Sequence, residues 1–157
     1  MSNSDDEGNL ALNKIADVPE LHHATVTWQD SGVAILTIRN AGPLNVLSSA
    51  VMEDVRHAIT RVSADPLLRV LILRGEGDEA FVAGADVHEM VGLDGPGATA
   101  FITRLYGLCE AVRNCPVPVI ARLCGYCLGG GLQLAASCDI RLVAEGTRFG
   151  MPEVRVG

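Results

Sequence analysis

The chain has 157 residues, of which 48% are hydrophobic and 20% charged, a composition typical of one globular domain. Its formal net charge is −7, with 19 acidic residues against 12 basic ones. This balance disfavours a nucleic-acid-binding protein, which normally carries a basic surplus. No uncharged apolar run in the sequence is long enough to span a bilayer, so we expect no membrane partner.

Ser, Asn, Asp and Glu dominate the start of the chain, and this composition predicts a disordered tail over residues 1–20. After it, two β-rich runs flank Asp30-Ser31-Gly32, which predicts a hairpin between residues 23 and 40. The second run, at residues 33–38, is mostly apolar and predicts a strand buried on both faces.

Further along the chain, predicted strands alternate with predicted helices. Because of this alternation, the sequence predicts an α/β fold with a largely parallel sheet. Apolar spacing predicts helices over residues 49–64, 98–114 and about 131–137, and a short one within residues 81–90. Aliphatic strands are expected at residues 70–73, 117–123 and 140–143.

A glycine turn, Gly129-Gly130-Gly131, leads directly into a helical run. Free backbone N–H groups at such a helix N-terminus suit a phosphate or an enolate oxygen. The dinucleotide fingerprint G-x-G-x-x-G requires a different spacing, and the absence of Gly-Lys-Ser/Thr excludes a P-loop. A tight turn that needs glycine only for packing is the alternative.

A second turn of small residues, Ala83-Gly84-Ala85-Asp86, also precedes a predicted helix. If the two turns converge, each can offer one N–H group to a single oxygen, which is the arrangement of an oxyanion hole. A carboxylate downstream of the glycine turn, at Glu153, could then supply a base.

Four blocks of the sequence together carry a specific resemblance. They are Leu44-Asn45-Val-Leu, Phe81-Val-Ala-Gly-Ala-Asp-Val-His-Glu-Met90, Gly125-Tyr-Cys-Leu-Gly-Gly-Gly131 and Phe149-Gly-Met-Pro-Glu153. With these blocks the chain resembles the crotonase superfamily, the enoyl-CoA hydratase/isomerase family, from about residue 25 to residue 157. The resemblance implies an α/β, crotonase-like ββα spiral fold, truncated before the C-terminal helical region. Residues 21–157 would form this incomplete domain, with apolar faces left exposed.

The resemblance also implies a chemistry. Backbone N–H groups of Ala85 and Gly130 would hold the thioester carbonyl of an acyl-CoA and stabilise the enolate formed beside it. Glu153 would be the catalytic acid/base. Gln133 stands where hydratases have a second glutamate, and an amide can orient water but cannot take its proton. The pattern therefore favours isomerase-type chemistry. A hydratase proper, or a non-catalytic paralogue that binds acyl-CoA or a full-length partner, is the alternative.

The substrate pocket implied by the resemblance is lined mostly by backbone groups. Its residues are Leu44, Asn45, Val46, Ala83, Ala85, Asp86, Val87, His88 and Gly130. No metal or redox cofactor is expected, because backbone dipoles would stabilise the charge and coenzyme A arrives as part of the substrate. For a full-length chain the resemblance implies a homo-oligomer, either a trimer or a dimer of trimers.

The cysteines are Cys109, Cys115, Cys124, Cys127 and Cys138. An odd number, scattered through apolar segments, argues against a disulfide framework and predicts a reducing, cytoplasmic compartment. Cys124-Gly-Tyr-Cys127 has the spacing of a redox pair or of half a zinc site. Packing in the core is the favoured interpretation of both thiols.

Overall fold

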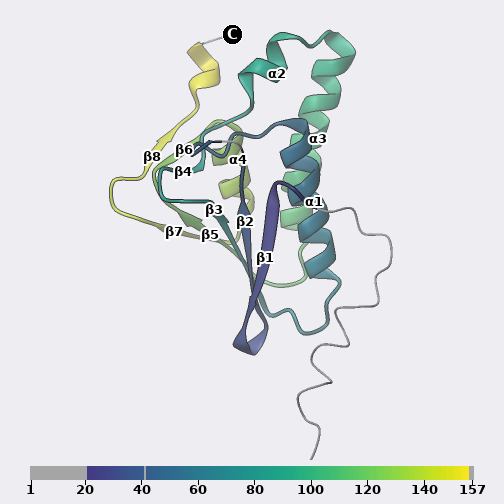
Figure 1. Cartoon of the computed structure of the whole chain (residues 1–157), viewed down its shortest axis with the longest axis vertical. Helices are drawn as coiled ribbons and strands as arrows, with labels where there is room; N and C mark the ends of the chain where they lie inside the picture. The colour runs from purple at the N-terminus through teal and green to yellow at the C-terminus, as the bar shows by residue number, and fades with distance from the viewer. Residues whose placement is uncertain (1–20, 41, 156–157) are drawn as a thin grey trace, which may run out of the picture.

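The computed structural model describes residues 21–40 and 42–155 (Figure 1). The tail predicted at residues 1–20 lies outside the described residues. In chain order the elements are β1 (Ala24–Gln29), η1 (Asp30–Gly32), β2 (Val33–Ile38), α1 (Ser49–Ser63), β3 (Val70–Gly75), β4 (Ala80–Val82), α2 (Val87–Val91), α3 (Gly95–Arg113), β5 (Val119–Leu123), β6 (Tyr126–Leu128), α4 (Gly130–Ser137), β7 (Ile140–Val143), β8 (Arg148–Gly150) and η2 (Pro152–Arg155).

The larger sheet has the strand order β1-β2-β3-β5-β7. The β1–β2 pair is antiparallel and forms the predicted hairpin, with the 3-10 turn η1 at its tip. All other pairs in this sheet are parallel, because a helix or a second-sheet strand intervenes between successive members. The prediction of an α/β fold with a largely parallel sheet is confirmed.

Burial along β2 differs from the prediction. Ala34, Leu36 and Ile38 are fully buried, whereas the residues between them are only half-buried. Alternation of this kind belongs to a strand with one face on the core and one face partly open. The prediction of burial on both faces is therefore wrong. The apolar run suggested it because Val33 and Ile35 are apolar although they point to the open side.

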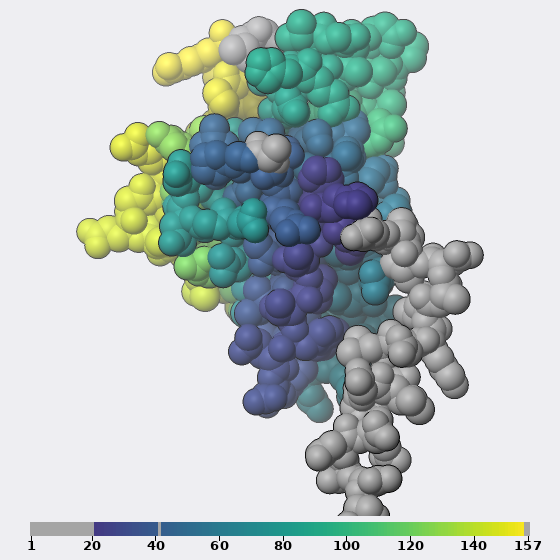
Figure 2. Space-filling model, in the orientation of Figure 1, coloured from purple at the N-terminus to yellow at the C-terminus, as the bar shows by residue number. Residues whose placement is uncertain are grey.

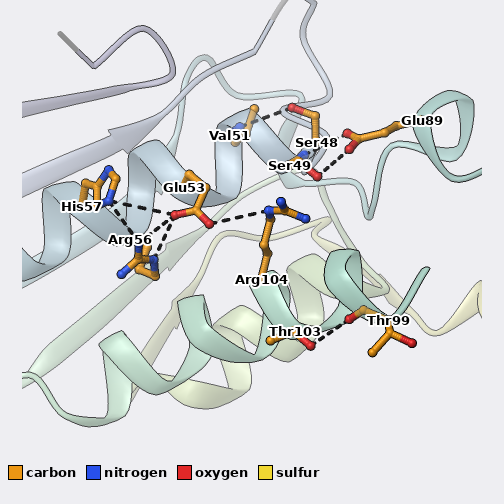
Figure 3. A network of polar contacts seen from close by, with 10 residues as sticks. All are labelled: Ser48, Ser49, Val51, Glu53, Arg56, His57, Glu89, Thr99, Thr103 and Arg104. Carbon is orange, nitrogen blue, oxygen red and sulfur yellow. Dashed lines mark hydrogen bonds and ion pairs between the residues drawn. The ribbon is translucent and has the colours of Figure 1, made fainter. Parts of the chain in front are cut away.

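The helices α1 and α3 pack against each other on one side of the larger sheet (Figure 1). Ser48 caps α1, its hydroxyl accepting a hydrogen bond from the Val51 N–H at 3.3 Å. Glu53 on α1 accepts from Arg56 one turn on, at 2.7 Å, and lies 3.6 Å from Arg104 Nε on α3 (Figure 3). This partly exposed network ties the two helices together at their surface, while apolar burial between them supplies most of the stabilisation.

A second, three-stranded parallel sheet has the order β4-β6-β8. The sequence did not predict it, because each strand has only three residues and β6 lies between two glycines, Gly125 and Gly129, where a turn was expected. In this sheet Leu128 of β6 pairs with Gly150 of β8. The small sheet therefore joins the glycine turn to the segment that carries Glu153.

Apolar side chains are exposed along β7, the edge strand of the larger sheet, and in the segment after it. The exposed large apolar residues there are Ile140, Leu142, Val143, Phe149, Met151 and Val154, and Val154 is 85% exposed. In Figure 2 this segment, in yellow, projects from one side of the molecule. Such a continuous apolar edge is typical of a surface that another part of a protein covers. None of the helices within residues 21–155 is long and apolar enough to cross a membrane.

Candidate active site

The glycine turn forms the tight connection between β6 and α4. Gly129 has a positive φ of 49°, which an L side chain rarely adopts, and it is the residue that precedes α4. A side chain at Gly131 would overlap the backbone oxygen of Val82, so glycine is needed there for close packing. Among residues 21–40 and 42–155, no hydrogen bond engages the N–H of Gly130, the first residue of α4. This N–H is thus available to an external oxygen.

The second predicted turn runs beside the segment before α1. The Ala83 N–H donates to the Leu44 carbonyl at 2.9 Å, the Leu47 N–H to the Gly84 carbonyl at 2.8 Å, and the Asp86 N–H to the Leu47 carbonyl at 2.9 Å. This ladder leaves out the N–H of Ala85, which has no hydrogen-bond partner among the described residues. Its orientation is fixed by the bonds on either side.

The two turns lie next to each other. Gly84 has a φ of 115°, and a Cβ on it would stand 3.7 Å from the carbonyl oxygen of Leu128, the residue before Gly129. Gly131 lies against Val82 in the same way. Both unengaged N–H groups, those of Ala85 and Gly130, therefore belong to adjoining stretches of backbone.

Glu153 reaches the glycine turn through the small sheet. The Gly129 N–H donates to the Gly150 carbonyl at 2.9 Å, and the chain then enters η2. A Cβ built on Gly129 would lie 3.0 Å from Cδ of Glu153 and would overlap its Oε1. The carboxylate thus occupies the space beside the turn that the missing side chain leaves open. Glu153 is exposed here, so residues 21–155 do not enclose it.

Gln133 lies in the first turn of α4 and is exposed, its N–H donating to the Gly129 carbonyl at 3.0 Å. It lines a groove of about 490 Å³ between α3 and α4. Leu105 also lines it, and its Cδ2 would be 3.4 Å from a Cβ on Gly130. Arg113 and Ser137 line it as well.

The predicted coenzyme A residues fall into two groups, and the first lies between β2 and α1. Leu44 is 41% exposed and Val46 is half-buried, so both are near the surface. Asn45 is only 1% exposed, and its Nδ2 donates to the carbonyls of Glu76 and Ala80 at 3.0 Å each. The Asn45 side chain consequently holds two loops together from inside the protein.

The second group leads into α2. Ala83, Ala85 and Asp86 are half-buried, whereas Val87 and His88 are exposed on the helix. Asp86 caps α2, its Oδ1 accepting a hydrogen bond from the His88 N–H at 2.9 Å.

Sequence analysis missed Glu89 on α2. Its carboxylate accepts hydrogen bonds from the Ser49 N–H, at 2.8 Å, and from the Ser49 hydroxyl (Figure 3). It therefore caps the start of α1 across a sequence separation of 40 residues. No local pattern could reveal this contact, because it depends on how α2 is placed against α1.

The cysteines are free thiols, and those of the C-x-x-C pattern, Cys124 and Cys127, are buried. Cys124 Sγ lies 3.8 Å from the Gly77 carbonyl oxygen. Burial raises the pKa of Cys127 from its usual 9.0 to about 11, the opposite of what a reactive thiol needs. Core packing is consistent with these findings, and residues 21–155 hold no group of three or more potential metal ligands.

Comparison with known proteins shows the family and the fold class of this chain. A family model for enoyl-CoA hydratase/isomerase matches residues 29–157. The chain therefore belongs to the enoyl-CoA hydratase/isomerase family, as its four sequence blocks predict. A solved enoyl-CoA hydratase/carnithine racemase from Magnetospirillum magneticum superimposes with a TM-score of 0.82 at 34% identity, covering 88% of this chain and 52% of that one. The predicted crotonase-like fold is confirmed.

Several curated relatives are similar in sequence. The crotonyl-CoA hydratase of Syntrophomonas wolfei is 37% identical over 132 residues, 82% of this chain and 50% of the relative. A probable enoyl-CoA hydratase of Bacillus subtilis is 40% identical, over 82% of this chain and 49% of its own length. The human mitochondrial methylglutaconyl-CoA hydratase is 32% identical, over 87% of this chain and 40% of its own length. This chain spans about half the length of the relatives it matches, consistent with its resemblance to the N-terminal part of the family.

Proposed function

We propose that this chain binds an acyl-CoA thioester and transfers a proton on its acyl group. The observation that carries the proposal is the position of the Glu153 carboxylate beside Gly129, next to the unengaged N–H of Gly130. A thioester oxygen held by that N–H and by the N–H of Ala85 would place the adjacent carbon near a carboxylate base. These are the two requirements of enolate chemistry, a stabilised oxyanion and a positioned base.

In the proposed reaction Glu153 removes a proton from the acyl chain, and the electron pair moves onto the thioester oxygen. The N–H groups of Ala85 and Gly130 stabilise the resulting enolate. When the enolate collapses, Glu153 returns the proton at a different carbon, and the double bond shifts. Each such N–H donor typically contributes about 3 kcal/mol to lowering a barrier of this kind. No metal, redox or prosthetic group is needed for these steps, and coenzyme A is part of the substrate.

Gln133 decides between two versions of this chemistry. Its amide can orient a water molecule but cannot take its proton, so a single carboxylate at Glu153 favours isomerisation over hydration. Hydration is the second candidate, and the names of the relatives, all hydratases, favour it. A paralogue that binds acyl-CoA without turnover, or binds a full-length partner through the exposed edge at β7, is the third.

The substrate's coenzyme A moiety is proposed to lie along residues 44–46 and 83–88. Support comes from the exposure of Leu44, in the hydrogen-bonded segment beside Ala85, and of Val87 and His88, which follow Ala85 in the sequence. Asn45 would contribute through the loops it holds, because its side chain is buried. Assembly into a homo-oligomer is likewise proposed, and the exposed apolar residues of β7 are its support.

Calorimetric titration of the chain with short 2-enoyl-CoA and 3-enoyl-CoA substrates, followed by analysis of the recovered ligand, tests the proposal. Binding with a shifted double bond would support isomerisation, and a hydroxyacyl product would support hydration. Binding without conversion would support the paralogue that only binds. If neither ligand binds, the result would contradict the proposed function.

A further inference from the structure

We propose that Tyr126 and Arg148 are positioning residues for Glu153. Their side chains meet across the small sheet, between β6 and β8, and this contact sets where the carboxylate stands relative to the Gly130 N–H. The inference rests on the proposed function, because it assigns a task in the same proton transfer. It goes further by naming two residues that act on the rate through Glu153 and not through the substrate.

Tyr126 and Arg148 lie directly opposite each other, as partners in the parallel pairing of β6 with β8. The Arg148 guanidinium lies 5.6 Å from the centre of the Tyr126 ring, and Arg148 Nη1 donates to the Tyr126 hydroxyl at 3.3 Å. An aromatic face attracts a guanidinium at this distance, and the hydrogen bond gives the contact a direction. The two side chains therefore hold β8 against β6 in addition to the backbone ladder.

The same pairing continues from this contact to the carboxylate. Two residues further along each strand, and on the same face of the sheet, Leu128 pairs with Gly150. The Gly129 N–H donates to the Gly150 carbonyl at 2.9 Å, and Glu153 follows three residues later, with its carboxylate beside Gly129. A shift of β8 on β6 is therefore passed on to the position of the carboxylate.

The strand β8 has no buried side chain to anchor it. It is an edge strand of the small sheet, with β6 as its neighbour (Figure 1). All residues of β8 and η2 are exposed except Gly150, which is half-buried, whereas β4 at the opposite edge is buried along its whole length. The position of Glu153 consequently depends on how β8 is held on β6, and the Tyr126–Arg148 contact is part of that hold.

Proton transfer depends steeply on where the base stands. A displacement of about 1 Å can cost a catalysed reaction about 100-fold in rate. Such a displacement would leave the proposed coenzyme A contacts at residues 44–46 and 83–88 in place. Loss of the Tyr126–Arg148 contact is therefore expected to lower kcat and to leave KM near its parental value.

The experiment measures deuterium exchange next to the thioester of butyryl-CoA in D2O over a range of ligand concentrations. Tyr126→Leu removes the ring and the hydroxyl, so kcat for exchange should fall at least about fivefold, with KM within about twofold of the parent. Tyr126→Phe keeps the ring beside the guanidinium and should retain at least about half of the parental kcat. Tyr106→Leu is the matched control, since the Tyr106 ring lies 5.9 Å from the Arg113 guanidinium on α3, outside the small sheet, and it should keep both constants.

A second variant covers the case in which Tyr126→Leu loses its fold. Arg148 is exposed, so Arg148→Met removes the same contact without disturbing the core, and it should lower kcat in the same way. The double variant should lose no more than the larger of the two single losses, because the two residues act as one unit.

Parental kcat in Arg148→Met, a Tyr126→Phe variant as impaired as Tyr126→Leu, or losses that add in the double variant would overturn the positioning role and leave the proposed function intact. A rise in KM at parental kcat would also overturn it, since the pair would then belong to the binding surface. A parent chain that catalyses no exchange would overturn both.

Discussion

The carboxylate of Glu153 fills the space that a side chain on Gly129 would occupy. This relationship joins the acid/base to the turn that carries the proposed oxyanion donor, and it gives Gly129 a second role beyond its positive φ. Because Gly129 follows β6 and Glu153 follows β8, the relationship depends on the pairing of these two strands.

Gly129→Ala should therefore damage both stability and function. The backbone of Gly129, at φ 49° and ψ −121°, costs an alanine about 1–3 kcal/mol, and its Cβ would also displace the Glu153 carboxylate. Urea unfolding should show the loss of stability, and proton transfer to acyl-CoA should fall at least about tenfold. Gly146→Ala is the matched control, since Gly146 has a φ of 80° and nothing within 4 Å of an added Cβ. Equal proton transfer by the two variants would contradict the account.

Asn45 is expected to act through stability. Asn45→Ala leaves the buried carbonyl of Ala80 and the part-buried carbonyl of Glu76 without their donor, which costs about 2 kcal/mol, and it places alanine at a φ of 49°. Urea denaturation of this variant is compared with that of Asn114→Ala, an exposed position. Parental stability of Asn45→Ala, combined with weakened coenzyme A binding, would instead make the residue a direct ligand contact.

Glu89 is expected to position α2. Glu89→Gln removes the negative charge at the start of α1 and weakens two hydrogen bonds to Ser49, which should lower the free energy of unfolding by about 1 kcal/mol. Because α2 follows Ala85 and Asp86 directly, acyl-CoA affinity should fall as well. Glu145→Gln, on an exposed turn, should change neither quantity. A Glu89→Gln variant with parental stability would show that the contact with α1 contributes nothing.

Buried thiols predict how stability depends on pH. Burial raises the pKa of Cys127 to about 11 and that of Cys138 to about 12, from a usual 9.0. In the unfolded chain both thiols lose their protons near pH 9, whereas the folded protein keeps them. The stability that this provides is complete below pH 9 and is lost as the pH rises through 11 and 12. Urea midpoints for Cys127→Ala and Cys138→Ala between pH 8 and 10.5 should show a shallower decline than the parent; an identical slope would contradict the assignment.

Gln133→Glu tests the interpretation of the single carboxylate. A second carboxylate in the first turn of α4 could take a proton from water, so hydration of a short 2-enoyl-CoA should rise by roughly tenfold or more. Gln29→Glu introduces the same charge at an exposed position of β1 and serves as control. Strong hydration by the parent chain would contradict the preference for isomerisation.

Sequence alone predicted much of this fold, because long helices and strands show a periodic pattern of apolar residues. The helices α1 and α3 and the parallel strands β3 and β5 follow from apolar periodicity over many residues. The small sheet could not be predicted in this way, since three-residue strands such as β6 show no periodicity. It is nevertheless what brings Gly129 and Glu153 together.

The candidate site was predicted unevenly for a similar reason. Short sequence motifs contain Ala85, Gly130 and Glu153, and these motifs can be recognised without knowledge of the fold. The structure brings the three segments together. The role of Glu89 could not be predicted in this way, because it acts through a partner on another element, Ser49. Contacts of this kind become visible only when the helices are placed in space.

Hydrogen–deuterium exchange on the acyl group tests the central claim most directly. The chain is incubated with butyryl-CoA in D2O, and mass spectrometry follows deuterium at the carbon next to the thioester. The account predicts exchange by the parent and by Glu145→Gln, and a loss of roughly 100-fold or more in Glu153→Gln. Exchange by Glu153→Gln at the parental rate, or no exchange by a parent that binds the ligand, would contradict it.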